Sequence, residues 1–184
     1  MSLPKYKYLL TYRYTEIIYD LTIAFCQCFL SDYQNRRTRE QMEQAARRGK
    51  QNIIEGVGQG RTSKKGEIKL LGVAKASLEE LLADYEDFLR ARKLVIYPKT
   101  HPKIGVFRKI GFRLSDLRNL SNLGSLKEKP VLPRSPQDAA NLLLTFCHQA
   151  TYLLDKQITK AEEQFVQSGG YTENLFKKRL SHRI

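Results

Sequence analysis

The chain has 184 residues, enough for one domain with a hydrophobic core, and a formal net charge of +13. No apolar run approaches the roughly 20 residues that span a bilayer, and the charged N-terminus does not resemble a secretion signal. The sequence therefore predicts a cytoplasmic location and no membrane partner. So large a positive excess favours a polyanionic partner, such as RNA or another nucleic acid.

The first half of the chain predicts three amphipathic helices. The first covers about 8–31, and its apolar residues occupy more than one face. The second begins at Thr38 in a capping-box pattern and ends in the glycines of 56–60. Its apolar stripe consists mostly of small residues, which lets a neighbouring helix approach closely. That stripe comprises Met42, Ala46, Gly49, Ile53 and Gly56.

The third predicted helix begins near Thr62 or Ser63 and stops before Pro98. Its apolar residues step alternately by three and four positions, which is typical of antiparallel bundle packing. They are Leu71, Ala74, Leu78, Leu81, Tyr85 and Phe88.

A basic stretch rich in proline and glycine follows, and it is predicted to be an insertion. A short amphipathic helix with Val106, Phe107, Ile110, Leu114 and Leu117 on its apolar side is expected inside it. Residues 121–133 have the character of an irregular connection.

The fourth predicted bundle helix has a clear start and a clear end. Ser135 is expected at the N-cap, with Pro136 in the first helical position, and Gly169 and Gly170 end the helix. Residues 172–183 are expected to form a short basic terminal helix or tail.

Together these elements predict an all-α chain, an antiparallel up-down four-helix bundle with a basic insertion between the third and fourth helices and a short C-terminal extension. The expected division is 1–97 for the first three bundle helices, 98–134 for the insertion, 135–170 for the fourth helix and 171–184 for the tail. Helices one and four carry more apolar surface than one bundle needs, which predicts subunit contacts in a homo-oligomer.

Catalytic patterns are missing from the sequence. The glycine loop at 56–65 lacks the Gly-Lys-Ser/Thr order of a phosphate-binding loop and follows a helix instead of a strand. Cys147 and His148 are adjacent, so they do not face each other on a helix. No Glu-x-x-His pair suggests a di-metal site. The chain is therefore predicted not to be an enzyme and to hold no metal and no cofactor.

Cysteine usage points to a reducing compartment. Cys26, Cys28 and Cys147 are an odd number without metal-ligand spacing, so we expect three small buried residues.

The candidate binding residues are lysines and arginines that occur in clusters. Each cluster alone is typical of a solvated surface, but together they suggest an electrostatic footprint for nucleic acid. Free N–H groups at the start of the third helix, beside Arg61, Lys64 and Lys65, could also hold one phosphate. The predicted nucleic-acid-binding residues are Arg47, Arg48, Lys50, Arg61, Lys64, Lys65, Arg90, Arg92, Lys93, Arg108, Lys109, Arg113, Lys177, Lys178 and Arg179.

Three aromatic residues interleave with this basic stretch. Tyr97, Phe107 and Phe112 could stack on unpaired bases, or they could pack the insertion onto the bundle. The sequence leaves both interpretations open.

The region from Gln41 to Phe88 resembles the four helix bundle protein family, also known as the 23S rRNA-intervening-sequence protein family. The resemblance rests on Ala45-Ala46-Arg47, Asn52-Ile53, Glu55-Gly56, Ser63-Lys64-Lys65 and Leu78-Glu79-Glu80-Leu81. The chain departs from the family at Arg48-Gly49-Lys50, where Ser-Ile-Pro is common. Residues 148–155 and 169–173 are similar to the variant with a suffix extension.

The resemblance implies more about function than the residues alone do. The best understood similar proteins are accessory proteins of diversity-generating retroelements, which form barrel-shaped pentamers and bind a reverse transcriptase and its RNA template. A non-enzymatic pentamer that binds RNA and a reverse transcriptase is therefore expected. The alternative is a structural or protein-interaction adaptor whose charge meets an acidic protein partner.

Overall fold

The computed structural model describes residues 3–182, and within that range it contains helices, turns and loops but no β-strand. The all-α prediction is confirmed. The helices are α1 (Leu10–Phe29), α2 (Arg36–Gln59), α3 (Lys64–Ala91), α4 (Pro102–Ser115), α5 (Pro136–Ser168) and α6 (Tyr171–Ser181). The 3-10 turns are η1 (Lys5–Tyr8), η2 (Tyr33–Asn35) and η3 (Leu117–Asn119).

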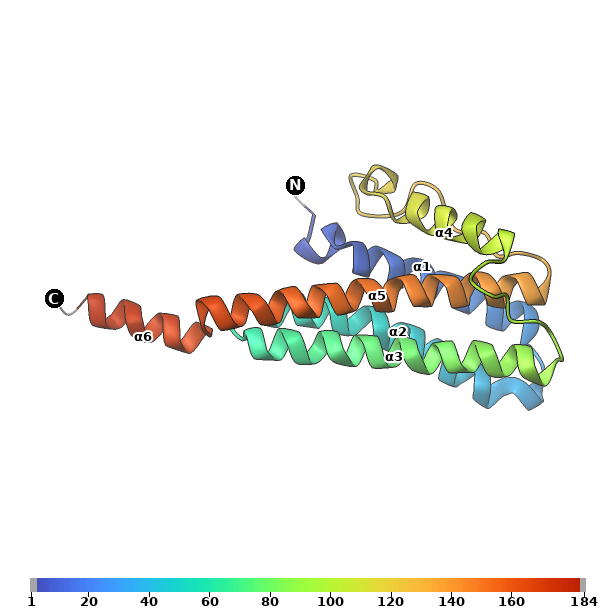
Figure 1. The fold of residues 1–184 in the computed structure, drawn as a ribbon, viewed down its shortest axis with the longest axis horizontal. Helices are drawn as coiled ribbons and strands as arrows, with labels where there is room; N and C mark the ends of the chain where they lie inside the picture. The colour runs from blue at the N-terminus through green and yellow to red at the C-terminus, as the bar shows by residue number, and fades with distance from the viewer. Residues whose placement is uncertain (1–2, 183–184) are drawn as a thin grey trace.

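Helices α1, α2, α3 and α5 lie side by side along the long axis of the molecule (Figure 1). Helix α2 packs against α1 and α3, and α5 packs against the same two helices from the other side. Helix α4 lies on the outside, over α1 and α5, and α6 extends beyond the end of α5. The molecule is therefore a helical bundle with one added helix on its side.

The contact between α2 and α3 confirms the small-residue prediction. All five residues of the predicted α2 stripe are buried, as is the whole predicted seam of α3. A Cβ on Gly49 would lie 3.0 Å from Cδ2 of Leu78, so a larger residue there would require the Leu78 side chain to shift. Burial of this continuous apolar seam is the main stabilisation of the pair.

The predicted ends of α2 need correction. The helix begins at Arg36 instead of Thr38, directly after η2, and no side chain caps it. Gly56 and Gly58 lie inside the helix, which continues to Gln59 and has Gly60 at its C-cap. Gly56 stays helical because its bare backbone packs against Leu70 and Leu71 of α3, and this contact outweighs its poor helix propensity.

The other predicted caps are confirmed. The Ser63 hydroxyl accepts a hydrogen bond from the Gly66 amide, 3.0 Å away, at the start of α3. Ser135 caps α5 in the same way, with Pro136 at the first helical position. At the other end Gly169 takes a φ of 69°, a conformation that favours glycine.

Helix α4 explains why α1 and α5 are so apolar. Its residues Ile104, Phe107 and Leu114 are buried against those two helices, so the apolar surplus that predicted subunit contacts is partly covered within one chain. The predicted apolar side of this helix was wrong at Val106 and Leu117, which are exposed. Leu117 lies beyond the end of α4, so it falls outside the helical periodicity that predicted its burial.

Arg13 of α1 ties α4 to the bundle. Its side chain is buried, and Nε donates to the backbone carbonyl of Ser115 at 2.5 Å while a terminal nitrogen donates to that of Lys7 at 3.0 Å. Burial lowers the pKa of this guanidinium, and the nearby Asp116 carboxylate opposes that effect. Because Ser115 is the last residue of α4, the cation also meets the negative end of the helix dipole.

Candidate nucleic-acid interface

The three predicted cations of α2 do not act as one cluster. Arg48 pairs with Glu80 of α3 at 2.6 Å, whereas Lys50 lies over the ring of Tyr19 of α1, 4.0 Å from its centroid. Arg47 is exposed between them and forms no ion pair within residues 3–182. Since α2 lies between α1 and α3, the three charges point in different directions around the helix.

The cations of the α2–α3 turn lie beside the end of α5. Arg61 and Lys64 line a hollow of about 360 Å³ together with Gln164 of α5 and Asn174 of α6. Lys64 pairs with Glu67 at 2.8 Å, which reduces its free charge.

The predicted phosphate contact at the start of α3 has local competitors. The Gly66 amide already donates to the Ser63 hydroxyl, and the Glu67 amide donates to the Ser63 carbonyl. The acidic side chain of Glu67 lies in the same turn. Exposed cations, with Lys65 among them, are therefore the stronger anion-attracting feature of this turn.

Arg90, Arg92 and Lys93 lie at the opposite end of α3. With 28 residues in that helix, they are roughly 40 Å from the α2–α3 turn. Arg90 pairs with Asp87 at 2.7 Å, and the Arg92 guanidinium lies 4.0 Å from the centroid of the Phe88 ring.

The remaining predicted cations belong to the two added helices. On α4, Arg113 pairs with Glu128 at 2.8 Å, whereas Arg108 and Lys109 are exposed without an ion pair in the described part of the chain. On α6, Lys177, Lys178 and Arg179 are exposed at the far end of the molecule.

The predicted cations are thus at the surface but are not gathered into one patch. They are distributed over the length of the molecule, and only those that pair with a carboxylate lose much of their attraction for an external anion. The prediction omitted two cations of this region. Lys99 precedes α4 and lines the same hollow as Arg108, and Lys103 lies in the first turn of α4 and pairs with Asp138. Neither belongs to one of the predicted clusters of cations, so no signal for them was present in the sequence.

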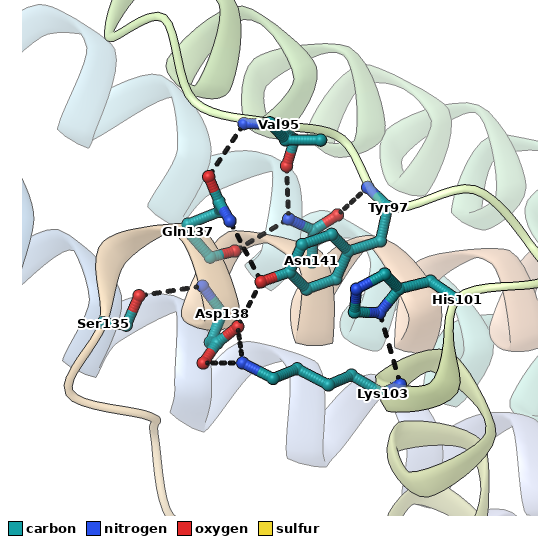
Figure 2. A network of polar contacts seen from close by, with 8 residues as sticks. All are labelled: Val95, Tyr97, His101, Lys103, Ser135, Gln137, Asp138 and Asn141. Atoms are coloured by element: carbon teal, nitrogen blue, oxygen red, sulfur yellow. Dashed lines mark hydrogen bonds and ion pairs between the residues drawn. The ribbon is translucent and has the colours of Figure 1, made fainter.

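A polar network fixes that segment to the start of α5, as Figure 2 shows. The Tyr97 hydroxyl donates to Asp138 at 2.6 Å, and Lys103 reaches the same carboxylate at 2.7 Å. Asn141, itself buried, accepts from the Tyr97 amide and donates to the Val95 carbonyl. Figure 2 shows these side chains converging on the first turns of α5, so the start of α4 is held in place by side chains.

The three aromatic residues of the basic stretch differ in whether they pack onto the bundle or could stack on a base. Phe107 is buried, and Tyr97 is half-buried in the network and stacks on His101 with a centroid separation of 3.9 Å. Both pack the added segment onto the bundle. Phe112 is 57% exposed, so its ring is free to contact a ligand.

The cysteine prediction was right for two residues of three. Cys26 and Cys147 are buried, and burial raises the pKa of each thiol, to about 12 for Cys26. Cys28 is exposed, because two helical positions rotate it away from the buried side of α1 that holds Cys26.

Within residues 3–182, no helix is both long and apolar enough to cross a membrane. The same range holds no group of three or more histidine, cysteine or acidic side chains placed to bind a metal ion. Comparisons with protein-family models, with curated proteins and with solved structures find no match for this chain.

Proposed function

We propose that this protein is a non-enzymatic accessory protein that binds RNA, mainly through contacts to phosphates. The observation that carries the proposal is the distribution of cations. The chain has a net charge of +13, its predicted cations lie on α2, at both ends of α3, on α4 and on α6, and most of them form no ion pair within residues 3–182. Such a surface attracts a long polyanion from many directions and does not read its sequence.

We further propose that α1, α2, α3 and α5 form the antiparallel up-down bundle of the resembled family, and that the chain assembles as a homopentamer with a reverse transcriptase as partner. The pairwise packing of the four helices supports the first part. The family resemblance of residues 41–88 supports the second. The buried free thiols of Cys26 and Cys147 support a reducing, cytoplasmic setting.

The test is RNA binding as a function of salt concentration. For single-stranded RNA, affinity is expected to fall on a log–log plot with a slope of about −0.7 per phosphate contact. Replacing Arg47, Arg48 and Lys50 by alanine, and separately Arg108, Lys109 and Arg113, is expected to weaken binding and to flatten that slope. The matched control removes three exposed lysines outside the predicted clusters, Lys5, Lys129 and Lys160.

The result that would overturn the proposal is binding by both triple variants that equals the parent's, at an unchanged oligomeric state. The clusters would then be solvated faces, and the adaptor with an acidic protein partner would replace the RNA-binding accessory. Light scattering that finds a monomer at micromolar concentration would remove the pentamer. A gene for a reverse transcriptase beside this gene, with a template repeat, would identify the partner.

A further inference from the structure

A cleft of about 500 Å³ opens between α4, α5 and the segment that precedes α4. Its walls contain Phe112 from α4, Tyr152 from α5 and Ile96 from the connecting segment. These side chains are 57%, 62% and 47% exposed. Aromatic rings that remain exposed along a concave wall are typical of a surface that contacts a flat ligand.

Positive charge lines the same cleft. Arg108 and Lys99 both line it, and Glu86 is the one acidic residue of its described lining. Partial burial lowers the pKa of His148; Glu86 opposes this effect, and Lys99 and Arg108 add to it. The cleft therefore combines apolar rings with cations near its mouth, which suits a planar group attached to an anion.

The wall of the cleft also holds an unsatisfied amide. Both the oxygen and the nitrogen of the Gln149 side chain are buried, and neither has a hydrogen-bond partner among the described residues. A Cβ on Gly111 would lie 2.9 Å from that oxygen, so the glycine leaves the room that the amide occupies. An amide offers a donor and an acceptor side by side, the pattern that pairs with the edge of a nucleobase.

The cleft is held open by the network of Figure 2. Tyr97 and Asn141 line the cleft and belong to that network, so one wall is fixed by hydrogen bonds of 2.6 to 2.7 Å. A ligand that enters does not have to order this wall, and preorganisation of this kind favours binding.

We propose that this cleft binds one unpaired base of single-stranded RNA. The base stacks on Phe112 and Tyr152, the Gln149 amide turns toward the cleft and pairs with the base edge, and Arg108 and Lys99 hold the neighbouring phosphates. The inference rests on the proposed function and adds to it a preference for single-stranded over duplex RNA. A pyrimidine or purine ring with its ribose fits the available volume.

The experiment uses the full chain and a short RNA that carries one 2-aminopurine, offered as a single strand or as a duplex. In the parent protein, the single strand is expected to bind more tightly, with a change in 2-aminopurine fluorescence as the base stacks. Replacing Phe112 and Tyr152 together by leucine is expected to weaken single-strand binding by about tenfold or more. Duplex binding and the salt slope are expected to stay unchanged, because the phosphate contacts remain.

The controls separate this inference from the proposed function. Tyr33→Leu removes an aromatic ring that is 86% exposed and lies outside the cleft, so it is expected to leave single-strand binding unchanged. Gln149→Ala, which removes the amide alone, is expected to reduce single-strand affinity with a smaller effect than the double variant. Circular dichroism and thermal melting check that each variant folds as the parent does.

Three outcomes decide the matter. Salt-sensitive RNA binding with no single-strand preference, and no loss in the double variant, overturns the cleft but leaves the proposed function intact. No RNA binding by the parent at low salt overturns both. Loss of single-strand binding and of the fluorescence change in the folded double variant, with duplex binding retained, establishes the cleft.

Discussion

The α2–α3 contact and the α4–α5 contact are built on different principles. In the first, small residues bring two helices together over a continuous apolar seam, and a Cβ on Gly49 would crowd the Leu78 side chain. In the second, buried apolar residues of α4 are joined by hydrogen bonds at the start of α5 and by Arg13 of α1, and a cleft remains beside them.

The difference between the two contacts indicates which part of the molecule is available for binding. A dry apolar seam gains stability with every contact and leaves no space for a ligand. The contacts of α4 leave a cleft, so apolar and charged groups such as Phe112 and Arg108 stay accessible there. The α2–α3 seam is therefore expected to contribute mainly to stability, and the ligand contacts proposed above lie in the region around α4.

The largest expected effect comes from filling the seam. Gly49→Leu forces α2 and α3 apart and is expected to reduce the free energy of unfolding by about 3 kcal/mol. Gly72 of α3 is the matched control, because a Cβ there meets no atom within 4 Å. Gly72→Ala is expected to stabilise by up to about 1 kcal/mol. Urea unfolding measures both, and equal effects would show that the seam is not tightly packed.

Removing the hydrogen bonds by which Arg13 joins α1 to α4 is expected to reduce the free energy of unfolding by a smaller amount. Arg13→Met keeps much of the buried volume but leaves the carbonyls of Ser115 and Lys7 without their donors, at a cost of about 2 kcal/mol. Hydrogen exchange is expected to accelerate in α4 before it does in α2 and α3. Uniform acceleration over the whole chain would mean that α4 is part of one cooperative unit with the bundle.

A smaller effect is expected from the polar network. Asn141→Ala leaves the Tyr97 amide and the Val95 carbonyl unpaired, at a cost of about 1.5 kcal/mol. The control is Gln167→Ala, an exposed position on the same helix. Faster hydrogen exchange at residues 94–101 would locate the change, and protection equal to the parent's would show that the network does not hold this segment.

The smallest expected effect is the loss of the stability that the Asp138 carboxylate contributes when the pH is lowered. Burial alone raises the pKa of Asp138, but hydrogen bonds from Lys103 and Tyr97 outweigh it, so the net pKa is lowered. A lowered carboxyl pKa contributes stability that is fully present above the unfolded value, near 4, and is lost as the pH falls through the folded value. The contribution is expected to be below about 1 kcal/mol, because the carboxylate is partly exposed.

The measurement compares the parent with Asp138→Asn in urea at pH 7 and near pH 3. The stability difference between the two proteins is expected to shrink at the lower pH. A difference that stays constant would show that the charge of Asp138 does not stabilise the fold.

Local signals predicted the helices well, and tertiary contacts explain the errors. Ser135 and Pro136 start α5 as expected, because a cap depends on neighbours in sequence. The start of α2 was wrong because η2 runs directly into it without a side-chain cap. The predicted end of α2 in the glycines of 56–60 came too early, because Gly56 is compensated by a contact with α3 that the sequence does not show.

The candidate site was less predictable than the fold. Charge clusters identify cations, but their partners, such as Glu80 for Arg48, come from other helices and decide which charges stay available. The cleft combines Phe112 and Tyr152 from helices far apart in sequence, and the unsatisfied amide of Gln149 has no pattern of its own. Such features appear only when the helices are packed.

Because Cys28 is exposed, it provides one thiol that can be labelled without any substitution. Cys26 and Cys147 are enclosed, and their raised pKa values keep them as unreactive thiols. A maleimide dye or a nitroxide should therefore attach at Cys28 alone, near the C-terminal end of α1, without any substitution. In an assembly of several copies, distances between such labels would report directly how the subunits are arranged.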